Sequence, residues 1–521
     1  MTKHKTLHFF WAAFPLSLLI LLLQVMPALA QSAAGKPDSI TTWSAGPNLP
    51  NPPSTLVRAV GVFFPADGNF YSVGGRTADT AGSDFQHVLR YSPTSNTWTL
   101  MGVTLPDNSM NNMACGALTV SGTPYIYCVG GSFATGTTGT ARVFFYNPAT
   151  DTATTLTAAD NWPGDAAGTI LPGGFVVVAN KLYIMGGFNI SMSMTHETWQ
   201  FDPTAAVGSR WTQKADYLMD RGYIPTTAIG NVIYTAGGSL WDGTTIHDTT
   251  DSFKYNIATD TWTAITNIPR VSAETRALNV YGQMWVMGGG RDAPNPNNEV
   301  DIYNPYCNTW TTGAPFVNAR RNFPTDTDGV SRVWLAGGYE PSAPAADMEI
   351  DKFPMATSAV SRRVHGGAGT FDVPLPLNGP TGIECRVGTS EQLVVTFSTS
   401  VTVATATVTC GTGTVGSISG SGTPTITVNL TGVTDAQRIT VTLNSVSDGT
   451  NSGDVPISMG VLVGDTTANG VVNAGDVSQT KSQVGQTVTG SNFREDVNVN
   501  GTISATDVAL VKSDVGHALP P

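Results

Sequence analysis

Short apolar runs that end in two glycines recur along the chain as far as residue 338. The runs are rich in β-branched and aromatic residues, which is typical of buried strands, and a glycine pair allows a sharp turn beside a neighbouring strand. The first glycines of successive pairs lie 49 to 56 residues apart. The six pairs are Gly74-Gly75, Gly130-Gly131, Gly186-Gly187, Gly237-Gly238, Gly288-Gly289 and Gly337-Gly338. Such a period predicts a propeller or another repeat array.

An aromatic residue and then a tryptophan complete most of these units. The aromatic residues are Tyr91, Tyr146, Phe201, Tyr255, Tyr303 and Phe353, and the tryptophans are Trp98, Trp211, Trp262 and Trp310. Ala153 stands in the place of the tryptophan in the second unit, so we expect less outer packing there. The sixth unit has no tryptophan after Phe353.

A lone tryptophan, Trp43, lies 55 residues before Trp98, which is one repeat length. This spacing is expected if the strand around Trp43 completes the sheet of the last unit, because the last sheet then has no unpaired edge strand. The double glycine, the aromatic residue and the closing tryptophan resemble kelch repeats over residues 39–354. The resemblance implies an all-β, six-bladed β-propeller with four antiparallel strands in each blade, closed by the N-terminal strand.

Residues 365–463 show a different pattern, in which apolar residues alternate with threonine or asparagine. Residues 392–397, 425–430 and 439–443 are examples, and a period of two indicates half-buried strands. About seven short strands with Gly/Ser turns predict a small Ig-like β-sandwich that serves as a spacer. Residues 355–364 are the expected linker between the propeller and this domain.

Two twelve-residue loops near the C-terminus match each other position by position. Aspartate stands at positions 1 and 12 and glycine at position 6, as in the EF-hand loop, which surrounds Ca²⁺ with oxygen atoms. The expected ligands of the first loop are Asp465, Thr467, Asn469, the carbonyl of Val471, Asn473 and Asp476. Those of the second loop are Asp496, Asn498, Asn500, the carbonyl of Thr502, Ser504 and Asp507.

A short helical pattern follows each loop and ends at Gly485 or Gly516. This tandem arrangement resembles a type I dockerin over residues 464–517. The resemblance implies two Ca²⁺ sites and a cohesin-type or cell-surface partner. Thr467 replaces the usual Asn or Asp at position 3, so we expect the second site to bind Ca²⁺ more strongly than the first.

In dockerins, positions 10 and 11 of the loops help to recognise the cohesin. Here they are Ala474-Gly475 and Ala505-Thr506, so the two faces of the expected module are unequal. Dockerin-like modules that act as stalk ends or intramolecular clasps are the alternative to cohesin binding.

The first 30 residues have the pattern of a secretory signal peptide. Lys3 and Lys5 precede an apolar run, and residues 28–30 form a small-x-small cleavage site. The alternative is an uncleaved membrane anchor, for which the apolar run is short. We therefore expect a mature protein that is secreted or held at the cell surface and that has no membrane span.

Charge and cysteine content narrow the picture further. The net charge of −12 argues against nucleic-acid binding, which needs a basic face. In an oxidising compartment Cys115 and Cys128 could pair across a hairpin, and Cys385 and Cys410 could form a second disulfide that leaves Cys307 unpaired. Five reduced, buried thiols are the alternative.

Arginines stand at one repeated offset in the predicted propeller. Arg58, Arg221 and Arg321 each lie 16 residues before the first glycine of a pair, and Arg320 is adjacent to Arg321. If these side chains face the central channel, they could form a cationic ring that suits a carboxylate or an acidic sugar. The structural alternative is that the arginine stems pack and their heads bridge neighbouring loops.

The sequence gives little support for a catalytic site. None of the seven histidines follows a tyrosine, so the copper motif of the galactose oxidase type is absent. His196 and His247 could share a metal, but no third zinc ligand is evident. Our first hypothesis is a secreted, non-catalytic protein whose propeller binds a glycan or protein and whose C-terminal module anchors it.

Two alternatives to this hypothesis remain. One is a carbohydrate-active enzyme, for polysaccharide or sialic-acid processing, that is carried on a dockerin. The other is a purely structural surface protein. No acid/base pair for the enzyme can be named from the sequence.

Overall fold

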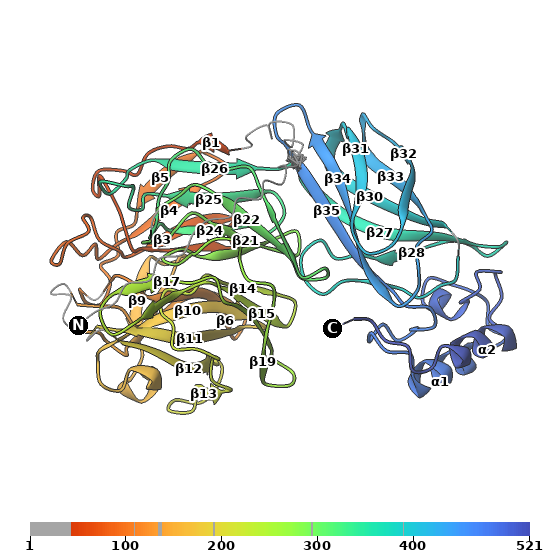
Figure 1. Ribbon diagram of the computed structural model, residues 1–521, viewed down its shortest axis with the longest axis horizontal. Helices are drawn as coiled ribbons and strands as arrows, with labels where there is room; N and C mark the ends of the chain where they lie inside the picture. Colours follow the sequence, from red (N-terminus) through yellow and green to blue (C-terminus); the bar gives the residue numbers. More distant parts are fainter. Residues whose placement is uncertain are drawn as a thin grey trace, which may run out of the picture. The chain divides into compact units, whose positions relative to one another are not determined.

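The computed structural model describes residues 43–108, 110–133, 138–190, 193–292, 295–388 and 390–520. The signal peptide expected at residues 1–30 lies outside these ranges. The described residues form β-sheets throughout and two α-helices near the C-terminus, as an all-β, kelch-propeller-like chain should (Figure 1). No helix in the described ranges has the length and apolarity needed to cross a membrane.

All the strands of the described residues up to Lys352, except β16 and β17, belong to six four-stranded antiparallel sheets. The first two sheets contain β2 (Val60–Phe64), β3 (Asn69–Val73), β4 (Val88–Ser92) and β5 (Thr97–Leu100), then β6 (Ala114–Val120), β7 (Thr123–Val129), β8 (Val143–Asn147) and β9 (Thr152–Thr155). The next two contain β10 (Ile170–Val178), β11 (Lys181–Asn189), β12 (Ser193–Phe201) and β13 (Trp211–Lys214), then β14 (Thr226–Ile229), β15 (Val232–Ala236), β18 (Ser252–Asn256) and β19 (Thr261–Ala264). The fifth sheet contains β20 (Ala277–Val280), β21 (Gln283–Met287), β22 (Val300–Asn304) and β23 (Thr309–Thr312). A small hairpin, β16 (Ser239–Trp241) and β17 (Ile246–Asp248), and two 3₁₀ turns at Ala158–Asp160 and Pro163–Asp165 decorate these sheets.

The sixth sheet joins the two ends of this region. It contains β24 (Thr325–Thr327), β25 (Arg332–Ala336) and β26 (Met348–Lys352), and β1 (Trp43–Ala45) pairs antiparallel with β26. Trp43 lies opposite Asp351, so the strand pairing expected from the position of this tryptophan is confirmed. The first strands of the sheets also contact one another in a closed circuit, from β2 through β6, β10, β14 and β20 to β24 and back to β2.

The tryptophans of the outer strands fasten each sheet to the preceding one. The indole N–H of Trp98 donates to the carbonyl oxygen of Pro47 at 3.0 Å, and that of Trp43 donates to Ala314 at 3.0 Å. Trp211, Trp262 and Trp310 make equivalent bonds to Asp160, Ala215 and Thr266. One side chain therefore supplies both outer packing and a hydrogen bond between sheets.

The second sheet, which has Ala153 in place of tryptophan, keeps a different tie to its neighbour. Asp151 accepts a hydrogen bond from the backbone N–H of Gly102 at 2.7 Å and another from the Tyr146 hydroxyl at 3.0 Å. Asp260 and Asn308 occupy equivalent turns and accept the same pair of bonds in their sheets. The second sheet therefore lacks the indole bond but keeps a polar tie that it shares with the fourth and fifth sheets.

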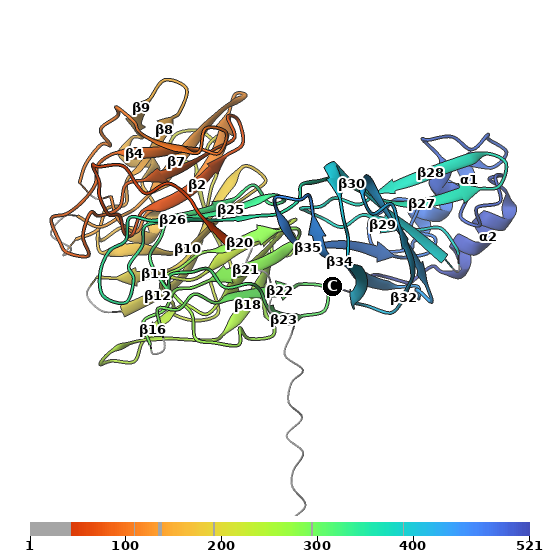
Figure 2. The same cartoon turned by 90° about the horizontal axis from the view of Figure 1, so that it is seen from above.

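Two further sheets follow the repeat region. One has the order β28-β27-β30-β33-β32 and the other the order β29-β35-β34-β31, and both supply buried residues to one core (Figure 2). Their strands are β27 (Ala356–His365), β28 (Gly369–Pro374), β29 (Ile383–Glu384), β30 (Ser390–Val401), β31 (Thr405–Cys410), β32 (Thr414–Ser419), β33 (Thr423–Thr431), β34 (Gln437–Ser447) and β35 (Ser452–Val461).

The expected linker at 355–364 is wrong, because almost all of it is strand β27. β27 pairs with both β28 and β30. Its inward positions include the polar residues Ser361 and Arg363, whose side chains bond to the buried Glu391. Because these polar residues lie on the buried face, β27 lacks the alternation of apolar and polar residues by which a strand is normally predicted.

The cysteine pairing differs in part from the expectation. Cys115 and Cys128 lie opposite each other on β6 and β7 and form the expected disulfide. The second disulfide joins Cys307 to Cys410, so the pair Cys385–Cys410 is wrong. Cys385 is free and buried beside Arg494, and burial raises the pKa of its thiol to about 12. The correct pairing depends on which turn of the repeat region meets β31, and the sequence does not specify this.

The C-terminal helices α1 (Ala474–Gln483) and α2 (Ala505–Ser513) each follow one of the matched loops. Asn473 and Ser504 cap them, and in each helix an aspartate three positions later accepts a hydrogen bond from the backbone N–H of the cap residue. A 3₁₀ turn at Phe493–Glu495 leads into the second loop.

Candidate functional site

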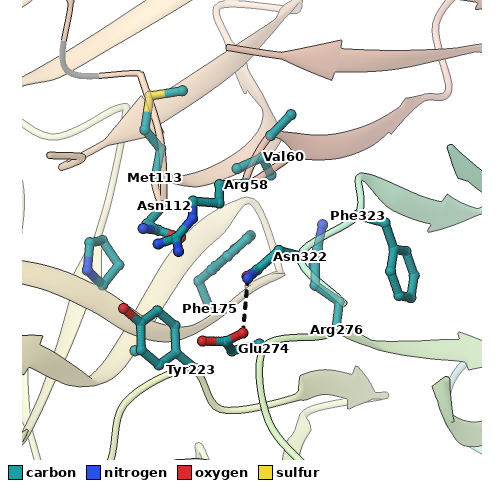
Figure 3. Close-up of a pocket in the computed structure, with 13 residues that line it drawn as sticks. Arg58, Val60, Asn112, Met113, Phe175, Tyr223, Glu274, Arg276, Asn322 and Phe323 are labelled. Carbon is teal, nitrogen blue, oxygen red and sulfur yellow. Dashed lines mark hydrogen bonds between the residues drawn. The ribbon is translucent and has the colours of Figure 1, made fainter. Parts of the chain in front are cut away.

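A pocket lies where the loops that lead into the first strands of the six sheets converge (Figure 3). Each sheet contributes one residue from an equivalent position to its lining. These residues are Arg58, Asn112, Pro172, Tyr223, Glu274 and Asn322. The pocket therefore has a mixed surface of cationic, acidic, amide and aromatic groups.

Backbone hydrogen bonds connect these equivalent residues around the pocket. The N–H of Arg58 donates to the carbonyl of Asn322 at 2.7 Å, and that of Asn322 donates to Glu274 at 2.7 Å. Glu274 donates in turn to Tyr223 at 3.3 Å, and Asn112 donates to Arg58 at 3.1 Å. Proline has no N–H, so the circuit is interrupted at Pro172.

The four donors and Tyr223, which accepts from Glu274, share an unusual backbone conformation. Their φ angles lie between 52° and 59°, the left-handed region that residues with a side chain seldom adopt. Strained backbone of this kind clusters at ligand-binding sites, where the surrounding structure holds it in place. This conformation could not be predicted from the sequence, because arginine, tyrosine and glutamate do not favour positive φ.

Glu274 is the most heavily bonded side chain at the pocket. It is only 3% exposed and accepts hydrogen bonds from Arg291, from Arg321 and, at 2.9 Å, from the Asn322 amide. Burial alone would raise the pKa of Glu274, but the guanidinium charges of Arg291, Arg321 and Arg58 hold it below its usual range. The carboxylate is therefore ionised at neutral pH and fixed in place.

The structure places the three arginines at the repeated offset, and the adjacent Arg320, in different surroundings. Arg58 lines the pocket and pairs with Asp79 at 2.7 Å, and Arg321 reaches the same cluster through Glu274. Arg221 instead binds Asp251 at 2.6 Å, and the fully buried Arg320 binds Asp347 at 2.5 Å and Glu349 at 2.9 Å. The latter two arginines bridge loops, as the structural alternative supposes.

The sequence analysis missed Arg276 and Arg291. Arg276 lines both this pocket and a larger cavity of about 440 Å³ that follows the first strands of the sheets. Its guanidinium lies 4.5 Å from the centre of the Phe175 ring and donates to the carbonyl of Gly61 at 2.8 Å. Asp326 lines the same cavity, and burial raises the pKa of its carboxyl group.

His196 and His247 do not meet at a common site. His196 lies 2.6 Å from a carboxylate oxygen of Asp220, whereas His247 lies 3.1 Å from Asp242 and 3.4 Å from Asp292. Within the described ranges, no group of three or more His, Cys, Asp and Glu side chains is arranged to hold a metal ion.

The two C-terminal loops have nearly identical hydrogen bonds. In the first loop, Asp465 accepts from the backbone N–H groups of Asn469 and Gly470 at 3.0 and 2.8 Å, and Asp476 accepts from Thr467 and Asn473 at 2.9 and 2.8 Å. In the second loop, Asp496 and Asp507 bind the corresponding four N–H groups. Each loop is therefore folded around two carboxylates.

These carboxylates suit a divalent cation. All four are fully buried, and no lysine or arginine among the described residues forms an ion pair with any of them. Burial raises the pKa of Asp465, and the nearby charge of Asp476 raises it further. Buried carboxylates need a cation or hydrogen bonds, and Ca²⁺ prefers such oxygen ligands, so the residues present fit this ion.

Comparisons with known proteins agree with both parts of the chain. The kelch motif matches residues 273–316, and the dockerin type I domain matches residues 463–516. The chain carries kelch repeats and a C-terminal type I dockerin domain. Domains of the dockerin type bind Ca²⁺ and dock to cohesin-type partners.

Relatives of the kelch region come from diverse organisms. Beta-scruin of Limulus polyphemus is 26% identical over 168 residues, which are 30% of this chain and 18% of that protein. An F-box/kelch-repeat protein of Arabidopsis thaliana is 28% identical over 141 residues, 26% of this chain and 35% of its own length. Kelch-like protein 23 of Homo sapiens is 31% identical over 120 residues, 23% of this chain and 20% of its own length. The chain thus spans about a third or less of each of these relatives.

Among solved structures, that of YjhT covers 58% of this chain and 95% of its own, with 13% identity and a TM-score of 0.45. A score this low carries no argument about function.

Proposed function

We propose that this chain is a secreted, non-catalytic binding protein made of a six-bladed kelch propeller, an Ig-like β-sandwich and a dockerin module. The closed circuit of first-strand contacts and the pairing of β1 with β26 support a six-bladed ring. The observation that carries the proposal is the central pocket, to which each of the six sheets gives one equivalent residue. A ring that presents six different side chains at one point is suited to recognition.

The chemistry of the pocket favours a glycan or a polar segment of a protein. Asn112, Tyr223 and Asn322 offer amide and hydroxyl groups that can bond to sugar hydroxyls, and Phe175 offers an apolar ring face. Arg58 adds a cationic donor that can bind a carboxylate. Small-molecule sites commonly combine a few such polar groups with apolar walls.

The dockerin module would anchor this binding protein. Ala474 and Gly475 at the start of α1, and Ala505 and Thr506 at the start of α2, are all exposed and therefore free to meet a cohesin-type or cell-surface partner. The two loops would each hold one Ca²⁺, with the second site stronger, because Asn498 offers an amide oxygen where Thr467 offers a hydroxyl.

One observation favours a second candidate function, a carbohydrate-active enzyme for polysaccharide or sialic-acid processing. Two carboxyl groups face the channel cavities with pKa values displaced in opposite directions, Glu274 downward by its arginines and Asp326 upward by burial. Such a division is typical of acid/base pairs in active sites. Arg276, which lines both cavities, could then bind an anionic substrate.

A glycan array probed with the purified chain, with mass spectrometry of each bound glycan, tests both candidates. We expect binding without turnover, and we expect Tyr223→Phe and Asn112→Ala to weaken it. Arg221→Lys is the matched control, because Arg221 shares the repeat offset of Arg58 but does not line the pocket. Binding that survives both pocket variants would place the ligand elsewhere. Turnover that disappears in Glu274→Gln would establish the enzyme instead.

A further inference from the structure

The second calcium loop is attached to the β-sandwich through a buried carboxylate. The Nδ1 atom of His365, at the end of β27, lies 2.8 Å from Oδ2 of Asp496, which is position 1 of the second loop. Both side chains are completely buried, although 131 residues separate them in the sequence. Asp496 thus has a partner outside its own module.

The surrounding hydrogen bonds fix which nitrogen of His365 carries the proton. Arg386 lies 3.0 Å from Nε2 of His365, and a guanidinium can only donate, so Nε2 must accept. The proton is therefore on Nδ1 and points at Asp496. Glu384 accepts two hydrogen bonds of 2.7 Å from Arg386 and holds it in place. In the series of hydrogen bonds from Arg386 through His365 to Asp496, each donor is therefore defined.

Neighbouring contacts hold the second loop against the sandwich. The N–H of Val387 donates to the carbonyl of Val497 at 2.8 Å, and the rings of Phe371 and Phe493 stack with centroids 5.5 Å apart. A Cβ added to Gly366 would lie 2.4 Å from the carbonyl oxygen of Asn500, so only glycine allows this approach. The His365 hydrogen bond therefore sits within a closely packed interface.

The first loop offers an internal comparison, because Asp465 has the same two backbone donors but, in place of the histidine, only a long bond of 3.4 Å from the Thr467 hydroxyl. The neighbouring Arg494 donates to the carbonyl oxygen of Asp465, at 2.8 Å, and not to its carboxylate. The carboxylate at position 1 is therefore held by one more strong donor in the second loop than in the first.

We infer that His365 is a positioning residue for calcium, which orients the Asp496 carboxylate from the sandwich and strengthens the second site. The inference rests on the proposed binding of Ca²⁺ by both loops. A donor that bonds to a metal-ligating carboxylate restricts its orientation, and loss of such a donor typically lowers metal affinity about 10- to 100-fold. The tighter second site would then be a property of two domains together.

Calorimetric titration of the full chain with Ca²⁺ tests the inference. We expect His365→Leu to weaken the second site at least tenfold and to leave the first site unchanged. His365→Asn should restore most of the affinity, because the asparagine amide can present an N–H near the position of Nδ1. The same variants in an Asp465→Ala background report on the second site alone.

Phe371→Leu is the packing control, since it removes a ring that packs against Phe493 and His365 but keeps both hydrogen-bond partners of the histidine, Asp496 and Arg386. The inference is overturned if Phe371→Leu weakens the second site as much as His365→Leu does, or if His365→Asn is no better than leucine. It is also overturned if both sites bind normally in His365→Leu. A wild-type chain that binds no Ca²⁺ would instead refute the proposed function, and an intact first site in each variant shows that the module has folded.

Discussion

Single glycines determine how closely the sheets of the repeat region approach one another. Gly237 has a φ of 68°, and a Cβ placed on it would lie 2.1 Å from the carbonyl oxygen of Ser272, in the segment that leads to the next sheet. Gly282 has nearly the same φ, 70°, but its Cβ would meet no atom within 4 Å. The two positions therefore separate backbone strain from steric collision.

We expect Gly237→Ala to lower the free energy of unfolding by clearly more than Gly282→Ala. The latter should cost about 1 kcal/mol, which is the usual penalty of a left-handed conformation for alanine. The former adds a collision with backbone that cannot move freely and should exceed about 3 kcal/mol. Urea unfolding of both variants measures the difference, and equal losses would contradict the steric explanation.

The free thiol of Cys385 gives a second test at the scale of one residue. Because burial raises its pKa to about 12, the reactive thiolate is scarce at pH 8 in the folded protein. We expect iodoacetamide to leave the native, non-reduced chain unlabelled and to label one cysteine after denaturation. Peptide mass spectrometry should place that label on Cys385, and a label on Cys307 would contradict the disulfide that the structure shows.

At the scale of elements, much of the fold could be predicted because each repeat carries its own strand and turn signals and most repeats carry a tryptophan. The dockerin module was also evident, since the same spacing of aspartate, asparagine and glycine occurs in two matched loops. Strand β27 was missed because Ser361 and Arg363 point into the core, where Glu384 and Glu391 receive them. Their partners lie more than 20 residues away, so no local pattern could show that these polar residues are buried.

The central pocket was predicted only in part for a similar reason. The offset of Arg58 and Arg321 could be found from the repeat, but Arg221 has the same offset and binds Asp251 instead. Whether an arginine faces the channel depends on which acids lie beside it in neighbouring sheets. These neighbours are set by the assembled ring and not by any single repeat.

The proposed Ca²⁺ site of each loop can be removed separately by one substitution. Asp465→Ala should abolish the first Ca²⁺ site and Asp496→Ala the second, because each variant loses a buried carboxylate around which its loop is folded. Calorimetry of each variant should show one bound ion where the wild type shows two. Unchanged stoichiometry in both variants would contradict the assignment of the loops.

At the scale of the molecule, closure of the ring depends on a strand from the far end of the repeat region. Deletion of residues 39–50 removes β1 and the indole of Trp43, exposes the edge of β26, and takes away the Pro47 carbonyl that accepts from Trp98. We expect the melting temperature of the repeat region to fall by several degrees, since the loss of roughly 2 kcal/mol shifts a domain of this size by about 4 to 8 °C.

Differential scanning calorimetry measures this effect. The control is a chain that lacks only residues 1–38 and therefore keeps β1. An unchanged melting temperature in the longer deletion would contradict closure by β1.

The disulfide between Cys307 and Cys410 has a consequence for the proposed function, in which the chain is anchored at one end and binds its ligand at the other. It joins the turn after β22 directly to β31, in parallel with the peptide connection that runs from β26 into β27. A pull on the anchored module would therefore reach the repeat sheets along two covalent paths rather than one. Force that would otherwise separate β27 from its sheet one hydrogen bond after another is shared with a covalent bond. In flowing surroundings the disulfide would therefore protect the connection between the repeat sheets and the anchored module.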